Sequence, residues 1–323
     1  MQFELSPEQT MLQQSVDRLT EKYRQFPVGH AAYTYYSDGL RHDLAESGFL
    51  EIGWTEGCGP LDAALLVERL ARLPCSAEVA ASALVGPVLG RELNGPLALC
   101  EDIRRPTRFL PQARHICMLA GEWVEFADLD AQLVRPHDSV IAYPLGVLLA
   151  PPVKTVRLSS AVADMVRTMW RIVLAAEAAG LMRGALDLTV RHVKERRQFK
   201  QPLGNLQAIQ HRLAIDEQLV GASFLLAMRA AYTLDPRDAA TAALYVQQHM
   251  RTLIYDCHQF TGAMGLTLEY PLHLWTYRLK FIQGELGGQA AQADALADLI
   301  WREGQPGPGD DISLSLPMAE GTV

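Results

Sequence analysis

The chain has 323 residues, 49% hydrophobic and 20% charged, a composition typical of a folded globular protein of about two domains, which excludes disordered and fibrous classes. Its 37 acidic residues outnumber its 29 lysines and arginines, so the formal net charge is -8. No overall positive field exists to attract nucleic acid or an anionic membrane surface, and we expect neither as a partner.

The distribution of cysteines, histidines and apolar residues excludes further classes of protein. The first residues lack the basic segment and apolar run of a secretory signal, and no apolar run reaches the ~18 residues of a membrane span. We therefore expect a cytoplasmic protein. The five cysteines are widely spaced without a CxxC pair, and HExxH is absent, so we expect neither disulfides nor a metal site.

Residues 1–93 predict a small helical domain. The run SPEQ at 6–9 combines a capping box with proline at the first helical position, and apolar residues then follow at helical spacing. A second helix is expected to end at Gly48, because glycine readily adopts the left-handed conformation that terminates helices. Two further helices are expected at 61–73 and 76–93.

Residues 94–158 predict a reduced β domain. The pattern changes here to proline-containing loops and short apolar runs such as ICMLA and EWVEFADL, which are typical of strands. After subtraction of the loops, this segment is too short for a large barrel.

Residues 159–305 predict an antiparallel four-helix bundle, because long Ala/Leu-rich segments follow one another with short breaks. The four helices are expected at 160–199, 205–234, 236–263 and 271–300. The final residues, 306–323, predict a loose or partner-docking tail.

Two segments of the bundle carry candidate ligand-binding residues. In 191–207, a cationic run ends a helix beside Phe199; an arginine there can pair with a diphosphate while the ring covers a cofactor edge. The helix dipole alone would also explain basic residues at a helix C-terminus. In 259–270, small residues permit close approach of a ligand, or simply cap a helix.

Taken together, these segments resemble the acyl-CoA dehydrogenase family. RRQFKQPLGNLQAIQHRLA is similar to the family's RxQFGxPLxxFQxxxHxLA stretch, and QFTGAMGLTLEYPLHLWTYR is similar to its QxxGGxGxxxExPxxxxxRD segment. MQFELSPEQTML and ESGFLEIGWTEG are similar to its amino-terminal domain. The resemblance implies a mainly α fold: an N-terminal helical domain, a reduced β domain and a C-terminal antiparallel four-helix bundle.

The resemblance also implies FAD shared across a subunit interface, with the isoalloxazine in one β domain and the ADP half on the neighbouring bundle. Arg196 would contact the pyrophosphate. The other implied cofactor contacts are Gln198, Phe199, Leu203, Leu206, Gln259, Gly262 and Ala263. Two residues depart from the family pattern, because Lys200 and Ala263 replace glycines.

The family removes the α-proton of its substrate with a glutamate while the flavin accepts the β-hydrogen as hydride. The two positions at which the family places that glutamate correspond here to Gly287 and Trp170, which cannot act as bases. Glu285 is the remaining candidate base. A two-residue displacement moves a carboxylate by several Å, so we expect an ordinary solvated loop glutamate instead.

The middle section also lacks most of the family's flavin-binding β segments; LCEDIRRP is at best a remnant of one. The chain thus resembles the short subunit of heteromeric (α2β2) members that act on CoA thioesters of steroid side chains. Our hypothesis is a subunit that donates ADP-side FAD contacts to a longer partner, which carries the base and the acyl-CoA pocket. The alternatives are a flavin-free structural paralogue, and a self-sufficient homo-oligomeric acyl-CoA dehydrogenase or related flavin oxidase.

Overall fold

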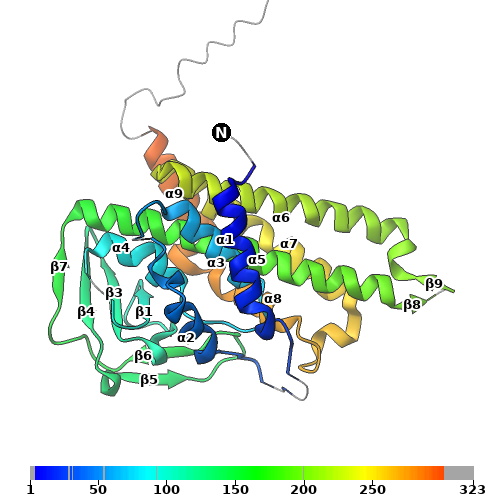
Figure 1. The fold of residues 1–323 in the computed structure, drawn as a ribbon, viewed down its shortest axis with the longest axis horizontal. Helices are drawn as coiled ribbons and strands as arrows, with labels where there is room; N and C mark the ends of the chain where they lie inside the picture. The colour runs from blue at the N-terminus through cyan, green and yellow to red at the C-terminus, as the bar shows by residue number, and fades with distance from the viewer. Residues whose placement is uncertain are drawn as a thin grey trace, which may run out of the picture.

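The computed structural model describes residues 4–301 except 28, 29, 31, 54, 92 and 199. Helices come first, two small sheets follow, and a group of long helices completes the chain (Figure 1). This arrangement confirms the expected fold class. The predicted tail, 306–323, lies outside the described residues. Among the described helices, none combines the length and hydrophobicity that crossing a bilayer requires.

The amino-terminal part contains α1 (Pro7–Thr20), α2 (Asp38–Glu46) and α3 (Pro60–Ala71), with the short 3-10 helices η1 (Glu21–Tyr23) and η2 (Phe49–Glu51). The capping box is confirmed: the Gln9 N–H donates to Ser6 Oγ at 3.2 Å and the Ser6 N–H donates to Gln9 Oε1 at 3.0 Å. Gly48 follows α2 with φ of 74°, as expected for a helix-ending glycine.

The helix expected at 76–93 is much shorter than predicted. Only a π-helical turn, η3 (Ala81–Val85), and α4 (Gly86–Leu89) are helical. Ser76 is extended instead, because its N–H donates to the Tyr35 carbonyl at 2.7 Å. Gly90, with φ of 63°, ends the helical stretch.

The β section forms two small sheets. Its strands are β1 (Leu97–Cys100), β2 (Thr107–Arg108), β3 (His115–Ala120), β4 (Trp123–Asp128), β5 (Val134–His137), β6 (Leu145–Leu148) and β7 (Val156–Leu158), with 3-10 turns η4 (Leu110–Gln112) and η5 (Ala131–Leu133). One sheet has the order β1-β3-β4-β7 and the other β2-β6-β5. The β1–β3 pair is parallel, and the other neighbouring pairs of these two sheets are antiparallel.

The bundle consists of α5 (Ser160–Glu195), α6 (Gln207–Thr233), α7 (Pro236–Thr261), α8 (His273–Ile282) and α9 (Gly288–Trp301). Between them lie the hairpin β8 (Arg197–Gln198) and β9 (Gln201–Pro202) and the 3-10 turns η6 (Leu203–Asn205), η7 (Gly262–Leu266) and η8 (Glu285–Gly287). The single helix expected at 271–300 is wrong. Leu286, Gly287 and Gly288 all have positive φ, which breaks it into α8 and α9.

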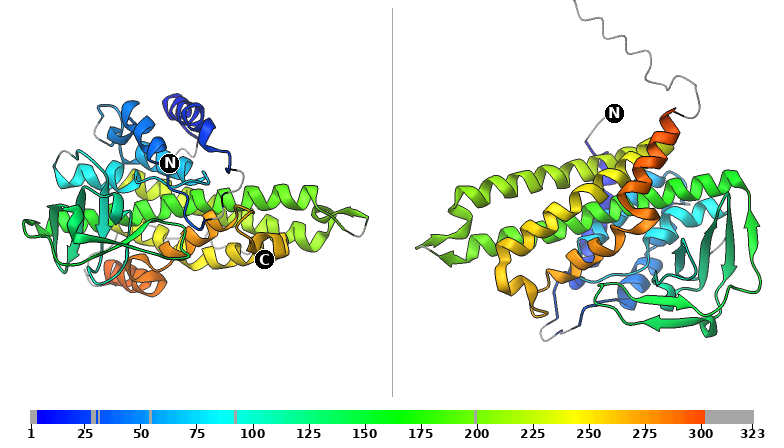
Figure 2. Two further views of the ribbon diagram at one scale, coloured as in Figure 1. Left: turned by 90° about the horizontal axis from the view of Figure 1, so that it is seen from below. Right: turned by 180° about the vertical axis from the view of Figure 1, so that it is seen from behind.

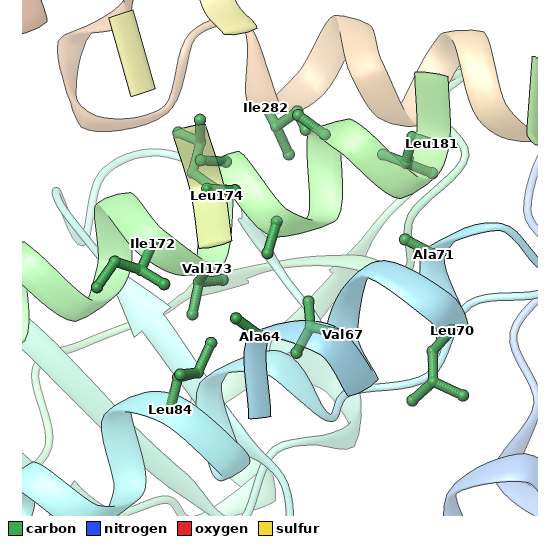
Figure 3. Close-up of a cluster of buried hydrophobic side chains, with 14 of the residues drawn as sticks. Ala64, Val67, Leu70, Ala71, Leu84, Ile172, Val173, Leu174, Leu181 and Ile282 are labelled. Carbon is green, nitrogen blue, oxygen red and sulfur yellow. The ribbon is translucent and has the colours of Figure 1, made fainter. Parts of the chain in front are cut away.

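Helix α5 joins the parts of the molecule, running from the sheets to the opposite end of the bundle (Figures 1 and 2). Val173 of α5 points toward Ala64 of α3 and Leu84 of η3, as Figure 3 shows, and all three side chains belong to the buried core. Gly180 permits the closest approach of α3, because a Cβ there would lie 2.1 Å from the Glu68 carbonyl oxygen.

Candidate functional site

The cationic segment predicted to bind a diphosphate lies at the end of the bundle farthest from the sheets (Figure 1). Arg196 directly follows α5, and its backbone N–H donates to the His192 carbonyl at 2.8 Å. Its carbonyl accepts the Leu203 N–H, also at 2.8 Å. The Arg196 side chain is exposed, and it forms no salt bridge within the described part of the chain.

The other predicted residues of this segment differ in burial. The Gln198 side chain is exposed on β8, whereas Leu203 and Leu206 are half-buried. Phe199 lies outside the described residues. Lys200, which replaces the family's glycine, has φ of 67°, so the left-handed turn is kept by a residue that adopts it at a cost of roughly 1 kcal/mol.

The second predicted segment begins in the last turn of α7. Gln259, Gly262 and Ala263 are exposed there, and Gly262 has φ of 59°. Ala263 is not among the residues with positive φ, so its Cβ causes no backbone strain. The chain then returns to α5, where the Tyr270 ring lies 5.8 Å from the His192 ring. Both predicted segments therefore lie at the same end of the bundle.

The donor set at this end suits a diphosphate. Four cationic side chains within seven residues are exposed: Lys194, Arg196, Arg197 and Lys200. Guanidinium and ammonium groups bind phosphate oxygens through charge-assisted hydrogen bonds. Because these side chains are exposed, they are accessible from outside the molecule.

Trp170, one of the two positions at which the family places its base, lies at a different place, together with the candidate base Glu285. Trp170 of α5 and Glu285 of η8 line one cavity of about 340 Å³ between the sheets and the bundle. Glu285 is only 8% exposed, so the expectation of a solvated loop glutamate is wrong. The broken helix turns its side chain inward. Gly287, with φ of 77°, lies in the turn itself.

Arg108 of β2 holds the Glu285 carboxylate with two contacts. Arg108 Nε lies 2.6 Å from Glu285 Oε1, and Nη2 donates to Oε2 at 3.1 Å. The same guanidinium donates from Nη1 to Glu177 Oε2 at 2.5 Å, and Glu177 Oε1 accepts the Tyr143 hydroxyl at 2.7 Å. One buried cation therefore serves two buried carboxylates.

Burial dominates the electrostatics of this cluster. Desolvation raises the pKa of Glu285 from 4.5 to about 7, although Arg108 opposes the rise. The neighbouring charges of Glu177 and Glu101 add to it. Because Arg108 also pairs with Glu177, its positive charge does not fully offset the cost of burying the Glu285 carboxylate.

Arg278 of α8 has a structural role. Its buried guanidinium donates to the carbonyls of Leu73 at 2.7 Å and Cys75 at 3.3 Å, as well as to that of Leu274. It therefore ties α8 to the chain that leaves α3.

Sequence reasoning missed Arg108, Glu177 and Tyr143. The sequence could have identified Glu177, because a single acidic residue within the apolar run LAAEAAG requires a buried partner. Nothing in the sequence identifies Arg108 as that partner, since it lies 69 residues away.

Comparison with known proteins agrees with this fold. A family model described as "Acyl-CoA dehydrogenase, C-terminal domain" matches residues 162–300. The acyl-CoA dehydrogenase FadE34 of Mycobacterium tuberculosis is 31% identical over 219 residues, which are 64% of this chain and 28% of that protein. Acyl-CoA dehydrogenase IpdE2 of the same organism is 28% identical over 299 residues, covering 84% of this chain and 90% of that protein.

Two solved structures have the same fold. The ChsE4-ChsE5 complex from Mycobacterium tuberculosis matches with a TM-score of 0.79 and 17% identity, covering 95% of this chain and all of the matched chain. The Tcur3481-Tcur3483 steroid ACAD G363A variant matches with a TM-score of 0.77 and 21% identity, covering 91% of this chain and 97% of the matched chain. Residues 162–300 therefore form an acyl-CoA dehydrogenase C-terminal domain, and the chain is similar in fold to these two structures.

Proposed function

We propose that the chain is a subunit of an FAD-dependent acyl-CoA dehydrogenase and contributes the bundle half of a flavin site to a longer catalytic partner. One contrast carries the proposal: Arg196 is exposed and unpaired by any described carboxylate, whereas Glu285 in the chain's own cavity is held by Arg108. The ChsE4-ChsE5 and Tcur3481-Tcur3483 neighbours, each named as a pair of proteins, support a heteromer.

Bound FAD would supply the hydride acceptor for oxidation of an acyl chain. In this chain, the Arg196 guanidinium would bind the diphosphate, as arginine forks bind phosphate oxygens elsewhere. The exposed amides of Gln198 and Gln259 would hydrogen-bond to the ADP half. The backbone at Gly262 and Ala263 is open to close approach, because both residues are exposed.

The partner would provide the catalytic base. Position 287 is glycine and position 170 is a buried tryptophan, so neither can remove a proton. Both oxygens of Glu285 contact Arg108, so this ion pair would have to break before the carboxylate could reach a substrate. The substrate would be an acyl-CoA; a steroid side chain is favoured because one structural neighbour is named a steroid ACAD.

A self-sufficient dehydrogenase or related flavin oxidase is the second candidate. It is favoured by one observation: Glu285 lines a cavity and has a pKa raised to about 7, the range in which general bases work at neutral pH. A flavin-free paralogue that keeps the bundle only for association would not need the exposed cations at 194–200.

The test is flavin retention by the complex of this chain with its longer partner. Arg196→Ala removes a charge-assisted contact, so FAD affinity should fall by about tenfold or more. The control is Arg18→Ala, which removes an exposed arginine from α1 and should leave flavin content unchanged. Equal flavin content in the Arg196→Ala and unsubstituted complexes would contradict the proposed site.

A further inference from the structure

A second group of arginines lines a pocket of about 250 Å³, and Arg196 is not part of that lining. Arg24 follows η1, Arg69 and Arg72 lie at the end of α3, and Arg191 lies on α5. The one carboxylate that lines the pocket belongs to Asp187. Three separate parts of the chain thus direct guanidinium groups to one enclosed space.

The pocket has a fixed aromatic wall. Trp275 of α8 is 6% exposed, and its indole N–H donates to the Arg72 carbonyl at 3.1 Å. Gly184 lets the indole lie directly on α5, because a Cβ there would fall 2.2 Å from Trp275 Nε1. Since the indole N–H is already satisfied and the ring is almost fully buried, Trp275 contributes only a small apolar edge to the pocket.

The carboxylates that pair with the arginines of this pocket do not neutralise every guanidinium charge. Asp17 is shared by Arg24, at 2.6 Å, and Arg69, whose Nε donates to it at 2.7 Å. Arg24 also reaches Glu21 at 3.1 Å, but that side chain is 77% exposed.

The other two arginines of the pocket, Arg72 and Arg191, differ in their salt bridges. Arg72 is paired with the buried Glu68 at 2.7 Å. Asp187 is paired with Arg183 at 3.2 Å, outside the pocket lining. Over the described ranges of the chain, no carboxylate lies within salt-bridge distance of Arg191.

This arrangement is preorganised for an anion. Asp17 and Glu68 hold three arginine side chains in place before any ligand arrives, which lowers the entropic cost of binding. Arginine forks match the oxygens of phosphate groups, and partial burial strengthens the attraction. We propose that this pocket binds a phosphate-bearing small anion, either inorganic phosphate species or the phosphates of a nucleotide.

The proposal is independent of the flavin site, and its test separates the two. The full-length protein is titrated calorimetrically with inorganic pyrophosphate and with ADP. Saturable binding is expected, and Arg191→Gln should weaken it by about tenfold, the effect of losing one charge-assisted contact. Arg191 is the residue to change because its removal leaves no described carboxylate unpaired.

The matched variant is Arg18→Gln on α1, an exposed arginine outside the pocket lining, which should bind both ligands as the unsubstituted protein does. Arg196→Gln is compared as well, because Arg196 is the proposed diphosphate contact of the flavin site. Equal affinities for pyrophosphate and ADP would show that the phosphate groups suffice, and tighter ADP binding would add a nucleotide contact with Trp275. The proposal is overturned if neither ligand binds saturably. It is also overturned if Arg196→Gln, and not Arg191→Gln, reduces binding.

Discussion

Replacing Glu285 with glutamine tests the most unusual electrostatic feature of the structure. The carboxylate is buried beside Arg108, Glu177 and Glu101, and burial raises its pKa to about 7 from 4.5. The folded protein therefore binds this proton more tightly than the unfolded chain does. The stability that results is fully present below pH 4.5 and is lost as the pH rises through 7.

The interval from 4.5 to about 7 corresponds to about 3 kcal/mol of unfolding free energy, at about 1.4 kcal/mol per pH unit. Glutamine does not titrate, so the Glu285→Gln protein does not lose this unfolding free energy as the pH rises. Its stability relative to the unsubstituted protein should therefore improve by about 3 kcal/mol between pH 4.5 and pH 8. Direct comparison at each pH cancels the other titrating groups, which both proteins share.

The assay is urea unfolding of both proteins at several pH values, with Glu122→Gln as the control for an exposed glutamate of the β section. The control should follow the unsubstituted protein throughout. A Glu285→Gln difference that does not vary with pH, or that changes in the opposite direction, would refute the account of this cluster.

Three further outcomes are expected. Gly180→Ala should lose about 1–3 kcal/mol in denaturant unfolding, because its Cβ would lie 2.1 Å from a carbonyl oxygen of α3; Gly221→Ala, with no atom within 4 Å, should not. Asp216 is fully buried, neither carboxylate oxygen has a partner among the described residues, and burial raises its pKa to about 7; Asp216→Asn should therefore raise Tm more at pH 8 than at pH 5. In the complex with its partner, Glu285→Gln should leave turnover nearly intact; a loss of orders of magnitude would instead identify Glu285 as the base.

Local signals in the sequence predicted much of the fold. The capping box at Ser6 and the helix start expected at 236 depend on residues within one helical turn, and both are confirmed. The break between α8 and α9 was missed, because helical periodicity continues through it and Leu286 is not a residue that favours positive φ.

The candidate site shows the same division between local and distant effects. The exposed positions of Arg196 and Gln259 follow from their places near helix ends. The burial of Glu285 does not, because its partner Arg108 lies 177 residues away in the β section. Such a pairing depends on how the sheets pack against the bundle, which no local pattern specifies.

The most direct test of the proposed function is the flavin content and mass of the chain, purified alone and after co-expression with a longer family member. The account predicts a colourless chain alone and a yellow complex of unlike subunits with about one FAD per pair. A yellow homo-oligomer with one FAD per chain would contradict it and would make Glu285 the first candidate base. A stable complex without flavin would also contradict it and would favour a purely structural subunit.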